Sequence, residues 1–347
     1  MNGSVMADAA ASTAEPLRRV AERKLSAADL DSQLKHADAP FVVRGLVADW
    51  PLVTAGLESA ASARAYLLDH RRERSFTVNI GEPGGGDRLF YDEAMGMNFR
   101  TGRAGLPEIF AGIDANEGKR DAPAIYLSSV DVQGYFEGLH EANHVDLGER
   151  QPIESIWIGT RTRIAAHNDF PSNLACCAVG RRRFTVFPPD QFANLYVGPI
   201  DFTPAGRPVS MVDLHNPDFK AYPHFRDALK TAQVAELEPG DAIFIPSMWW
   251  HHVEALAPFN VLVNYWWRDS PRFLAQPQDA LNHALLAIRD LPEDEKKLWR
   301  QMFDYYVFGD PAAVAAHIPE QARGILAPLD AESAGRIRAN LLRSLSR

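Results

Sequence analysis

The segment Ile153–Trp267 constrains the fold most strongly, because it consists of short runs of strand-forming residues separated by turn residues. This pattern favours an all-β barrel or sandwich over a parallel α/β fold, whose strands alternate with helices. Before this segment, Glu58–Arg72 predicts a helix and Phe76–Ile80 predicts a strand. We therefore expect a mainly β domain over residues 16–270, with additional helices and strands at its N-terminal side. Residues 1–15 are small and polar without periodicity, which predicts a mobile segment.

The sequence changes character after Trp267. Apolar residues then recur at helical spacing with more polar residues on the opposite side, a pattern typical of helices that pack against another surface. The helices are expected at Gln278–Asp290, Glu293–Val307 and Ala331–Leu345. We predict a C-terminal helical region over residues 271–347, whose apolar faces contact either the chain's own barrel or a second copy of the chain.

Charge and cysteine content limit the classes of function and the compartment. The formal net charge of -9 argues against a general nucleic-acid-binding protein, which usually presents a basic surface. No run of about 18 apolar residues occurs, so the sequence predicts no membrane-spanning helix. The two cysteines, Cys176 and Cys177, are adjacent, so they provide no disulfide framework and indicate a reducing compartment. Because no signal-peptide pattern is visible, we expect a cytoplasmic protein.

Three residues of the strand-rich segment form a candidate metal site. His167 and Asp169 are two apart on a predicted strand, so their side chains lie on one face and can bind one ion. His251, on a later predicted strand, would complete a set of two histidines and one carboxylate. Such a set leaves positions on Fe(II) open for a co-substrate and dioxygen. The neighbouring His252 competes with His251, but strand alternation places the two on opposite faces, so only one of them can be a ligand.

A second pattern competes for the metal. His140, Glu141 and His144 match His-Glu-x-x-His, in which two histidines one helical turn apart bind zinc and the glutamate acts as a base. Gly134 and Gly138 weaken the required helix by about 1 kcal/mol each relative to alanine. No further histidine follows at the spacing of the extended motif. We interpret the segment as a solvated loop or helix end and keep a zinc hydrolase as an alternative.

Three blocks occur in an order that resembles the JmjC and cupin-like oxygenases. The His-x-Asp strand comes first, then Gly-Arg-Arg-Arg-Phe-Thr-Val-Phe-Pro-Pro from Gly180, and finally Gly-Asp-x-x-Phe-Ile-Pro-x-x-Trp-Trp-His-His-Val from Gly240. The resemblance runs from about Pro40 to about Trp267 and is greatest to the asparaginyl hydroxylase branch. It implies a double-stranded β-helix, a jelly-roll barrel whose mouth holds Fe(II), with 2-oxoglutarate and dioxygen as co-substrates. The first histidine after Trp-Trp, His251, is then the metal ligand.

The resemblance also implies residues that bind 2-oxoglutarate. Arg182 stands where that branch has a lysine for the far carboxylate, and a guanidinium can hold a carboxylate through two parallel hydrogen bonds. Tyr126 matches a tyrosine that hydrogen-bonds the same carboxylate. Asn173 matches an asparagine near the keto acid, Asn264 one on the last barrel strand, and Trp266 a tryptophan beside the metal.

The implied activity is hydroxylation, or demethylation through hydroxylation, of a carbon in a protein or peptide side chain or in a small molecule. The branch also implies a homodimer formed by the C-terminal helices. Ile164 stands where the branch has a threonine hydroxyl, so a metal-binding, cupin-like regulatory or binding protein without turnover stays an alternative. The long connection Asp190–Thr231 is expected either to line the substrate entrance or to form a packed surface excursion.

Overall fold

The computed structural model describes residues 16–25 and 27–346. The predicted mobile segment 1–15 lies outside the described residues. The chain divides into two compact units, the first ending at Arg268 and the second beginning at Asp269. Each unit is described by itself.

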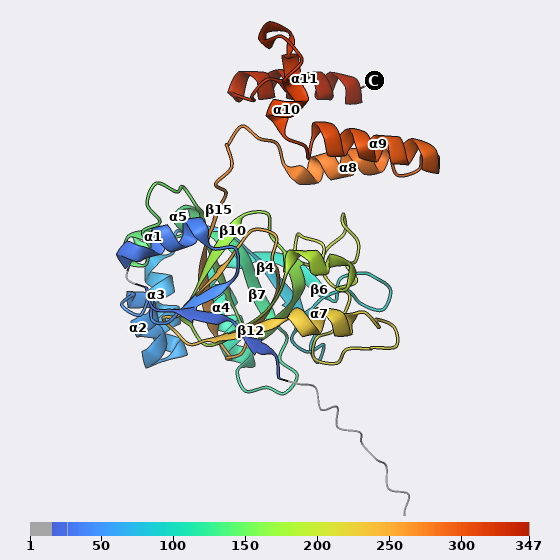
Figure 1. Ribbon diagram of the computed structural model, residues 1–347. Coiled ribbons are helices and arrows are strands. Elements are labelled where there is room, and N and C mark those ends of the chain that lie inside the picture. Colours follow the sequence, from blue (N-terminus) through green and yellow to red (C-terminus); the bar gives the residue numbers. More distant parts are fainter. Residues whose placement is uncertain (1–15, 26, 347) are drawn as a thin grey trace, which may run out of the picture. The chain divides into compact units, whose positions relative to one another are not determined.

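Two sheets build the first unit (Figure 1). The six-stranded sheet contains, in spatial order, β1 (Arg18–Arg19), β12 (Gln233–Leu237), β11 (Arg182–Phe187), β14 (Trp250–Ala255), β9 (Thr162–Asn168) and β5 (Arg88–Leu89). The nine-stranded sheet contains β2 (Ala21–Arg23), β3 (Phe41–Val43), β13 (Ala242–Ile245), β10 (Ser172–Val179), β15 (Asn260–Trp267), β8 (Ile153–Gly159), β7 (Ile125–Asp131), β4 (Ser75–Gly81) and β6 (Phe99–Gly105).

The eight consecutive strands β8–β15 form the barrel. β8, β10, β13 and β15 lie side by side in the larger sheet, and β9, β11, β12 and β14 lie side by side in the smaller one. This distribution of successive strands over two facing sheets confirms the predicted jelly roll. Side chains that alternate to the inner face, among them Cys177, Phe184, Val186 and Ile243, form one buried cluster drawn from both sheets.

Helices cover the outer face of the larger sheet (Figure 1). They are α1 (Ala27–His36), α2 (Pro51–Glu58), α3 (Ala60–His70), α4 (Leu106–Asn116), α5 (Val132–Tyr135) and α6 (Leu139–Ala142). Their apolar residues and the outward side chains of β8, β10 and β15 share the largest buried cluster, which includes Cys176. The helix predicted from Glu58 begins later, because extended Ser59 accepts a hydrogen bond from the Ser62 amide and caps α3.

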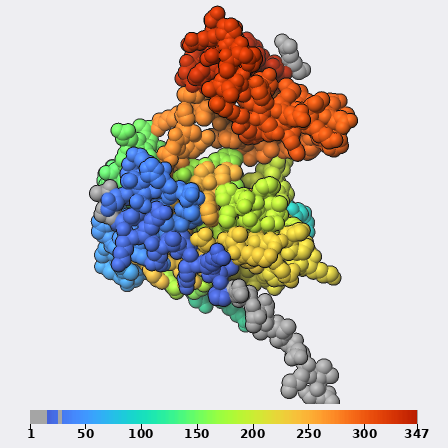
Figure 2. All heavy atoms as spheres, in the orientation of Figure 1, coloured from blue at the N-terminus to red at the C-terminus, as the bar shows by residue number. Residues whose placement is uncertain are grey.

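The connection from β11 to β12 packs on the outer face of the smaller sheet. It contains one 3-10 helix, Pro189–Ala193, and α7 (Phe225–Thr231). Leu195, Val212 and Phe225 of this connection form a buried cluster with Phe187 and Trp250. Figure 2 shows the yellow residues next to the blue N-terminal ones, where β1 pairs with β12. Part of the connection is therefore a packed layer of the domain.

The second unit is helical. Its elements are α8 (Pro277–Ala287), α9 (Glu293–Tyr306), α10 (Pro311–Ala315), α11 (Ala331–Leu345) and the 3-10 helices Glu320–Ala322 and Gly324–Leu326. α8, α9 and α11 contain no buried residue in the part of the chain that the structure describes, whereas α10 buries Val314 and Ala315. Among the described helices, none combines the length and the apolar character needed to cross a membrane.

The turn from β10 to β11 generates a stability prediction. Gly180 has φ +74°, and a Cβ there would lie 2.7 Å from the Phe259 carbonyl oxygen. Gly206 has φ +69° but open space around it, so it is a matched control for the backbone strain alone. We expect Gly206→Ala to lower the free energy of unfolding by about 1 kcal/mol. Gly180→Ala should cost at least about 2 kcal/mol more, because the clash is with backbone. Urea denaturation of both variants measures these free energies. Equal losses in Gly180→Ala and Gly206→Ala would contradict the prediction.

Candidate metal centre

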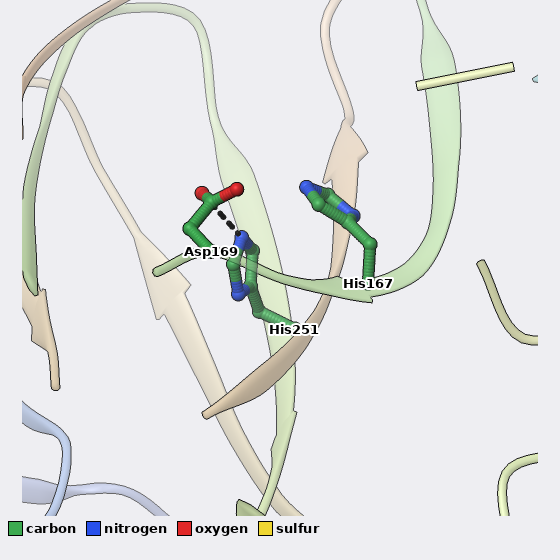
Figure 3. Close-up of side chains that lie close together, drawn as sticks. All are labelled: His167, Asp169 and His251. Carbon is green, nitrogen blue, oxygen red and sulfur yellow. Dashed lines mark ion pairs between the residues drawn. The ribbon is translucent and has the colours of Figure 1, made fainter. Parts of the chain in front are cut away.

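The pairing of β9 with β14 brings the predicted ligands together. The two strands are antiparallel neighbours, and their register sets His167 directly opposite His251. Asp169 follows His167 by two residues, so it lies on the same face. The candidate ligand atoms of the three residues lie within 4.8 Å of one another, and Figure 3 shows the side chains gathered at one place. His251 Nε2 is 3.5 Å from Asp169 Oδ2.

Backbone contacts fix the protonation of both imidazoles. His167 Nδ1 is 2.9 Å from the Ala165 carbonyl oxygen, and His251 Nδ1 is 3.1 Å from the Trp249 carbonyl oxygen. A carbonyl oxygen only accepts, so Nδ1 of each ring carries a proton and Nε2 is the atom left to bind a metal. Two imidazoles held by their outer nitrogens are oriented as metal ligands usually are.

Asp169 supplies the charge that a cation needs. Its side chain is 12% exposed, and its Oδ2 is buried without a hydrogen-bond partner. Leaving a buried carboxylate oxygen unpaired is costly, and a metal ion bound to it would remove that cost. Two imidazole nitrogens and one carboxylate are the donor set of a facial iron site, so the residues present fit Fe(II).

The pKa values of the cluster favour the ligand forms. Burial, together with the nearby charge of His251, lowers the pKa of His167 to about 4. Burial alone would raise the pKa of Asp169, but the nearby His251 imidazole, followed by His167 and Arg207, outweighs burial and lowers the pKa to about 2. Near neutral pH, His167 is therefore neutral and Asp169 is ionised, so protons do not compete for the metal.

His252 lies on the other side of β14. It is 4% exposed, and its ring centroid is 6.2 Å from that of His215 in the long connection. His215 Nε2 in turn lies 2.7 Å from Glu254 Oε2. The metal-ligand group contains His251 and not His252, in line with the alternation of side chains along a strand.

The His-Glu-x-x-His pattern is not a metal cluster. α6 ends at Ala142, so His144 is not on the helix that the zinc motif requires. His140 Nδ1 is 2.6 Å from Glu154 Oε2, so its imidazole contacts the barrel strand β8. Among the described residues, the only group of three or more such side chains close enough to hold one ion is the His167 cluster.

Arg182 is a buried cation inside the barrel. It is 1% exposed and lies on the face of β11 that also carries Phe184 and Val186. Burial lowers its pKa, and the Tyr126 hydroxyl and the Cys177 thiol oppose that effect. Its Nε has no hydrogen-bond partner, and no carboxylate of the described residues forms an ion pair with it. An uncompensated buried charge costs about 3 to 5 kcal/mol, which an anionic ligand would offset.

The other predicted co-substrate residues surround Trp157. Trp157 Nε1 donates to Asn264 Oδ1 at 2.7 Å, and Asn264 Nδ2 donates to Asn173 Oδ1 at 3.0 Å. The Trp157 ring lies 6.0 Å from that of Tyr126 and 5.6 Å from that of Trp266. Burial raises the pKa of Tyr126 to about 12, so its hydroxyl stays protonated. The structure therefore unites Tyr126, Asn173, Asn264 and Trp266 in one region of the barrel.

Trp157 has no role assigned from the sequence alone. Strand alternation could have indicated it, because Ile156 and Ile158 on either side belong to the outer cluster, which turns Trp157 inward. Ile164, which carries no hydroxyl, packs against the small cluster of Leu89, Ala124 and Tyr126. The space beside Tyr126 is thus apolar at this position.

The lowered pKa of His167 predicts an acid-sensitive fold in the metal-free protein. Its folded-state pKa of about 4 lies below the ordinary value of 6.5, so the unfolded chain takes up the proton first. The stability contributed by neutral His167 is complete above pH 6.5 and is lost as the pH falls towards 4. Between pH 7 and 4.5, the wild type should lose about 2 kcal/mol more unfolding free energy than His167→Gln. Urea titrations of both proteins at both pH values test this. Equal losses of unfolding free energy in the wild type and in His167→Gln would contradict it.

Comparison with known proteins connects the fold and the donor set to a family. The model of the cupin-like domain family matches residues 27–273, which include the eight barrel strands β8–β15 and all three candidate ligands.

Curated proteins of several organisms are similar to parts of the chain. HSPB1-associated protein 1 of Homo sapiens is 32% identical over 144 residues, 40% of this chain and 28% of that protein. Lysine-specific demethylase JMJ31 of Arabidopsis thaliana is 25% identical over 290 residues, 74% of this chain and 50% of that protein. tRNA wybutosine-synthesizing protein 5 of Danio rerio is 30% identical over 183 residues, 50% of this chain and 51% of that protein.

The chain thus matches about half or less of these relatives' own lengths. The greater likeness to the asparaginyl hydroxylase branch stays a prediction. The family match extends over more than half of the sequence and coincides with the jelly roll and its ligand cluster. The chain therefore belongs to the cupin-like domain family.

Proposed function

We propose that the chain is an Fe(II)- and 2-oxoglutarate-dependent oxygenase that hydroxylates a carbon of a protein or peptide side chain or of a small molecule. One observation carries the proposal: the same barrel holds a facial donor set and, on another strand, a buried arginine without a carboxylate partner. The facial donor set requires a metal ion, and the buried arginine requires an anion. A metal-chelating dicarboxylic acid would satisfy both.

The two ends of the proposed site are fixed by the strand register. On β11, Val186 pairs with His251 and Arg182 pairs with Ala255. Val186 and Arg182 are four positions apart, which corresponds to about 13 Å along a strand. His167, Asp169 and His251 would hold the iron on one side and leave its other positions open. Arg182 would hold the far carboxylate of 2-oxoglutarate, with the protonated Tyr126 hydroxyl as a further donor.

The iron and the keto acid would supply the oxidation of a carbon by dioxygen, which no amino-acid side chain performs. The chain's own residues would position and shield the reactants. Trp157, Trp266 and the hydrogen-bonded pair Asn173 and Asn264 contact one another, and in this proposal they would surround the keto acid with a rigid wall. A rigid, dry surrounding limits side reactions with water.

The names of the relatives leave the reaction open. One is called a lysine-specific demethylase and another a tRNA wybutosine-synthesizing protein. Hydroxylation and demethylation share the oxidation of a carbon, so both fit the same metal site. A binding protein without turnover is the second candidate, favoured by the apolar Ile164 beside Tyr126.

An anaerobic titration tests the metal and the co-substrate. Fe(II) followed by 2-oxoglutarate should produce the visible charge-transfer band of a chelated keto acid in the wild type. The band should be absent in His251→Ala, which loses a ligand, and present in His252→Gln, the matched control on the other face of β14. Arg182→Gln should bind iron but require at least about 30-fold more 2-oxoglutarate, whereas Arg182→Lys should need less than Arg182→Gln, because it keeps the charge.

Each outcome of the titration has a meaning. A band that persists in His251→Ala would contradict the ligand assignment. Iron binding without any band in the wild type would contradict the oxygenase and favour the binding protein. Equal 2-oxoglutarate dependence of the wild type and Arg182→Gln would contradict the role of Arg182.

We also propose that the C-terminal helices mediate a homodimer. Large apolar side chains of α8, α9 and α11 are exposed in the single chain, including Leu286 at 79%, Leu298 at 60% and Leu342 at 63%. Exposed large apolar side chains on otherwise unburied helices support a role of these helices in a protein interface. A stable dimer buries about 800 Å² per partner, which three amphipathic helices can provide.

Sedimentation velocity tests the dimer. The wild type should sediment as a dimer at micromolar concentration, and Leu298→Asp should sediment as a monomer because it places a charge in the apolar face. Lys297→Asp is the matched control, since Lys297 is the residue before Leu298 in α9 and its side chain is 73% exposed. A monomeric wild type would contradict the proposal, as would a dimeric Leu298→Asp variant.

A further inference from the structure

β6 is an edge strand of the first unit. It is the last strand of the nine-stranded sheet, and among the described residues it pairs with β4 alone (Figure 1). A strand in this position presents a row of unpaired amide and carbonyl groups, to which an extended segment of another protein can add as a further strand. His167 and His251 lie on strands of the other sheet, so this edge is separate from the candidate metal centre.

The pairing of β4 decides which backbone groups of β6 face outward. The Gly81 amide at the end of β4 donates to the Ala124 carbonyl oxygen, on the side of β4 where β7 begins, at 2.8 Å. Successive residues of a strand direct their amide and carbonyl groups to alternate sides. Val78, three positions before Gly81, therefore faces β6, where its partner is Gly102. The backbone of Gly102 is thus bound to β4.

Thr101 and Arg103 direct their backbone groups to the free edge, because they flank Gly102 and alternate with it. Outside the pairing with β4, no backbone hydrogen bond of residues 99–104 occurs in the described part of the chain. The Gly105 amide, which faces the same side, donates to Glu108 Oε2 at 3.1 Å. That bond closes the edge at the start of α4, so the open part of the edge lies before Gly105.

The side chains of this edge are positively charged. β4 and β6 together contain Arg100 and Arg103 and no aspartate or glutamate. Both arginines are exposed, and they lie on opposite faces of β6 because they are three positions apart. Arg103 Nη2 donates to the carbonyl oxygen of the neutral Ser75 at 3.0 Å, and Arg100 lines an open pocket with Ile80 and Pro123. In a chain of net charge -9, this edge is a local attractor of negative charge.

Gly102 is a further sign that another backbone approaches here. A Cβ at Gly102 would meet nothing within 4 Å, so packing within the chain does not explain a glycine in the middle of the strand. Glycine weakens a strand interior, and one of its uses is to let another backbone come close.

We propose that the free edge of β6 binds an extended, acidic segment of a partner protein by strand addition. The backbone groups of Thr101 and Arg103 pair with the backbone of that segment. Arg100 and Arg103 bind carboxylates on its two faces, which selects acidic segments. Pairing with an edge strand requires alternating amide and carbonyl groups, which a nucleic acid lacks. A second copy of β6 carries the same two cations, and charged edge residues of this kind disfavour pairing between copies.

Two pools of labelled peptides with blocked ends test this proposal by fluorescence anisotropy on the full-length protein. One pool contains two glutamates three positions apart, which places them on opposite faces of a strand, and the other contains two glutamines there. All other positions are randomised among threonine, valine, isoleucine and serine. The acidic pool should bind about 5-fold more tightly than the glutamine pool. The preference should nearly vanish at about 1 M salt, where charges are screened. Equal binding of both pools at low salt overturns the proposal.

Substitutions separate the backbone contact from the charge. Thr101→Pro removes an outward amide and keeps the pairing with β4, so the acidic pool should bind at least about 10-fold more weakly. Thr101→Val is the matched control, because both variants lose the hydroxyl that donates to Asn79 and only the proline loses the amide. Arg103→Glu should abolish the acidic preference, and Arg226→Glu, at an exposed position of α7, should keep it. Melting temperatures close to that of the wild type show that the variants are folded.

Amide hydrogen exchange locates the bound segment. In the free protein, the Gly102 amide should exchange slowly because it pairs with β4, and the Thr101 and Arg103 amides should exchange fast. The acidic pool at saturation should slow exchange at Thr101 and Arg103 at least about 10-fold and leave Gly102 unchanged. Binding without added protection at Thr101 and Arg103 overturns strand addition, as does full affinity of Thr101→Pro.

Two further outcomes would replace the proposed occupant. A single-stranded oligonucleotide that binds more tightly than the acidic pool, and loses this binding in Arg103→Glu, overturns the assignment to a peptide. A wild-type dimer that Thr101→Pro dissociates assigns the edge to a second copy of the chain. All of these measurements use the protein without iron or 2-oxoglutarate, so their results do not depend on the proposed oxygenase function.

Discussion

The hydrogen-bonded pairing of β9 with β14 is the contact on which the candidate site depends. It sets His167 opposite His251, although the two residues are far apart in the sequence. The pairing is itself held by the jelly roll, because β14 also pairs with β11 and closes the smaller sheet. A shift by one residue would turn one imidazole to the outer face, so the ladder specifies the metal site and the barrel core together.

The barrel interior combines an apolar cluster with buried polar and charged side chains. Phe184, Val186 and Ile243 fill its inner cluster, while Asp169 and Arg182 are charges that do not contact each other. Two such charges could lower their cost by forming an ion pair, and the fold keeps them apart on different strands. Their separation is costly for a protein without ligands and suits one that binds a metal ion and an anion.

The long connection between β11 and β12 packs on the barrel and also reaches the candidate metal centre. Its apolar residues cover the outer face of the smaller sheet, and Asp213 anchors it through Arg163. Its returning segment pairs with the end of β9, which brings Arg207 to the ligand cluster. A segment that packs on the barrel and reaches its mouth can vary in sequence without changing the metal site, as expected of a specificity element.

Local sequence patterns determined the fold class and the metal-ligand candidates. Alternation along strands placed His167 and Asp169 on one face and separated His251 from His252, because the side-chain period of a strand is a property of the local backbone. The order of the three sequence blocks predicted the jelly roll. Only the tertiary structure decided which partners these residues meet: the contact of His140 with Glu154, the network around Trp157, and the hydrogen bond from Arg207 to the Asn168 carbonyl oxygen. Those contacts join segments that are distant in sequence, and no local periodicity encodes the register in which such segments pair.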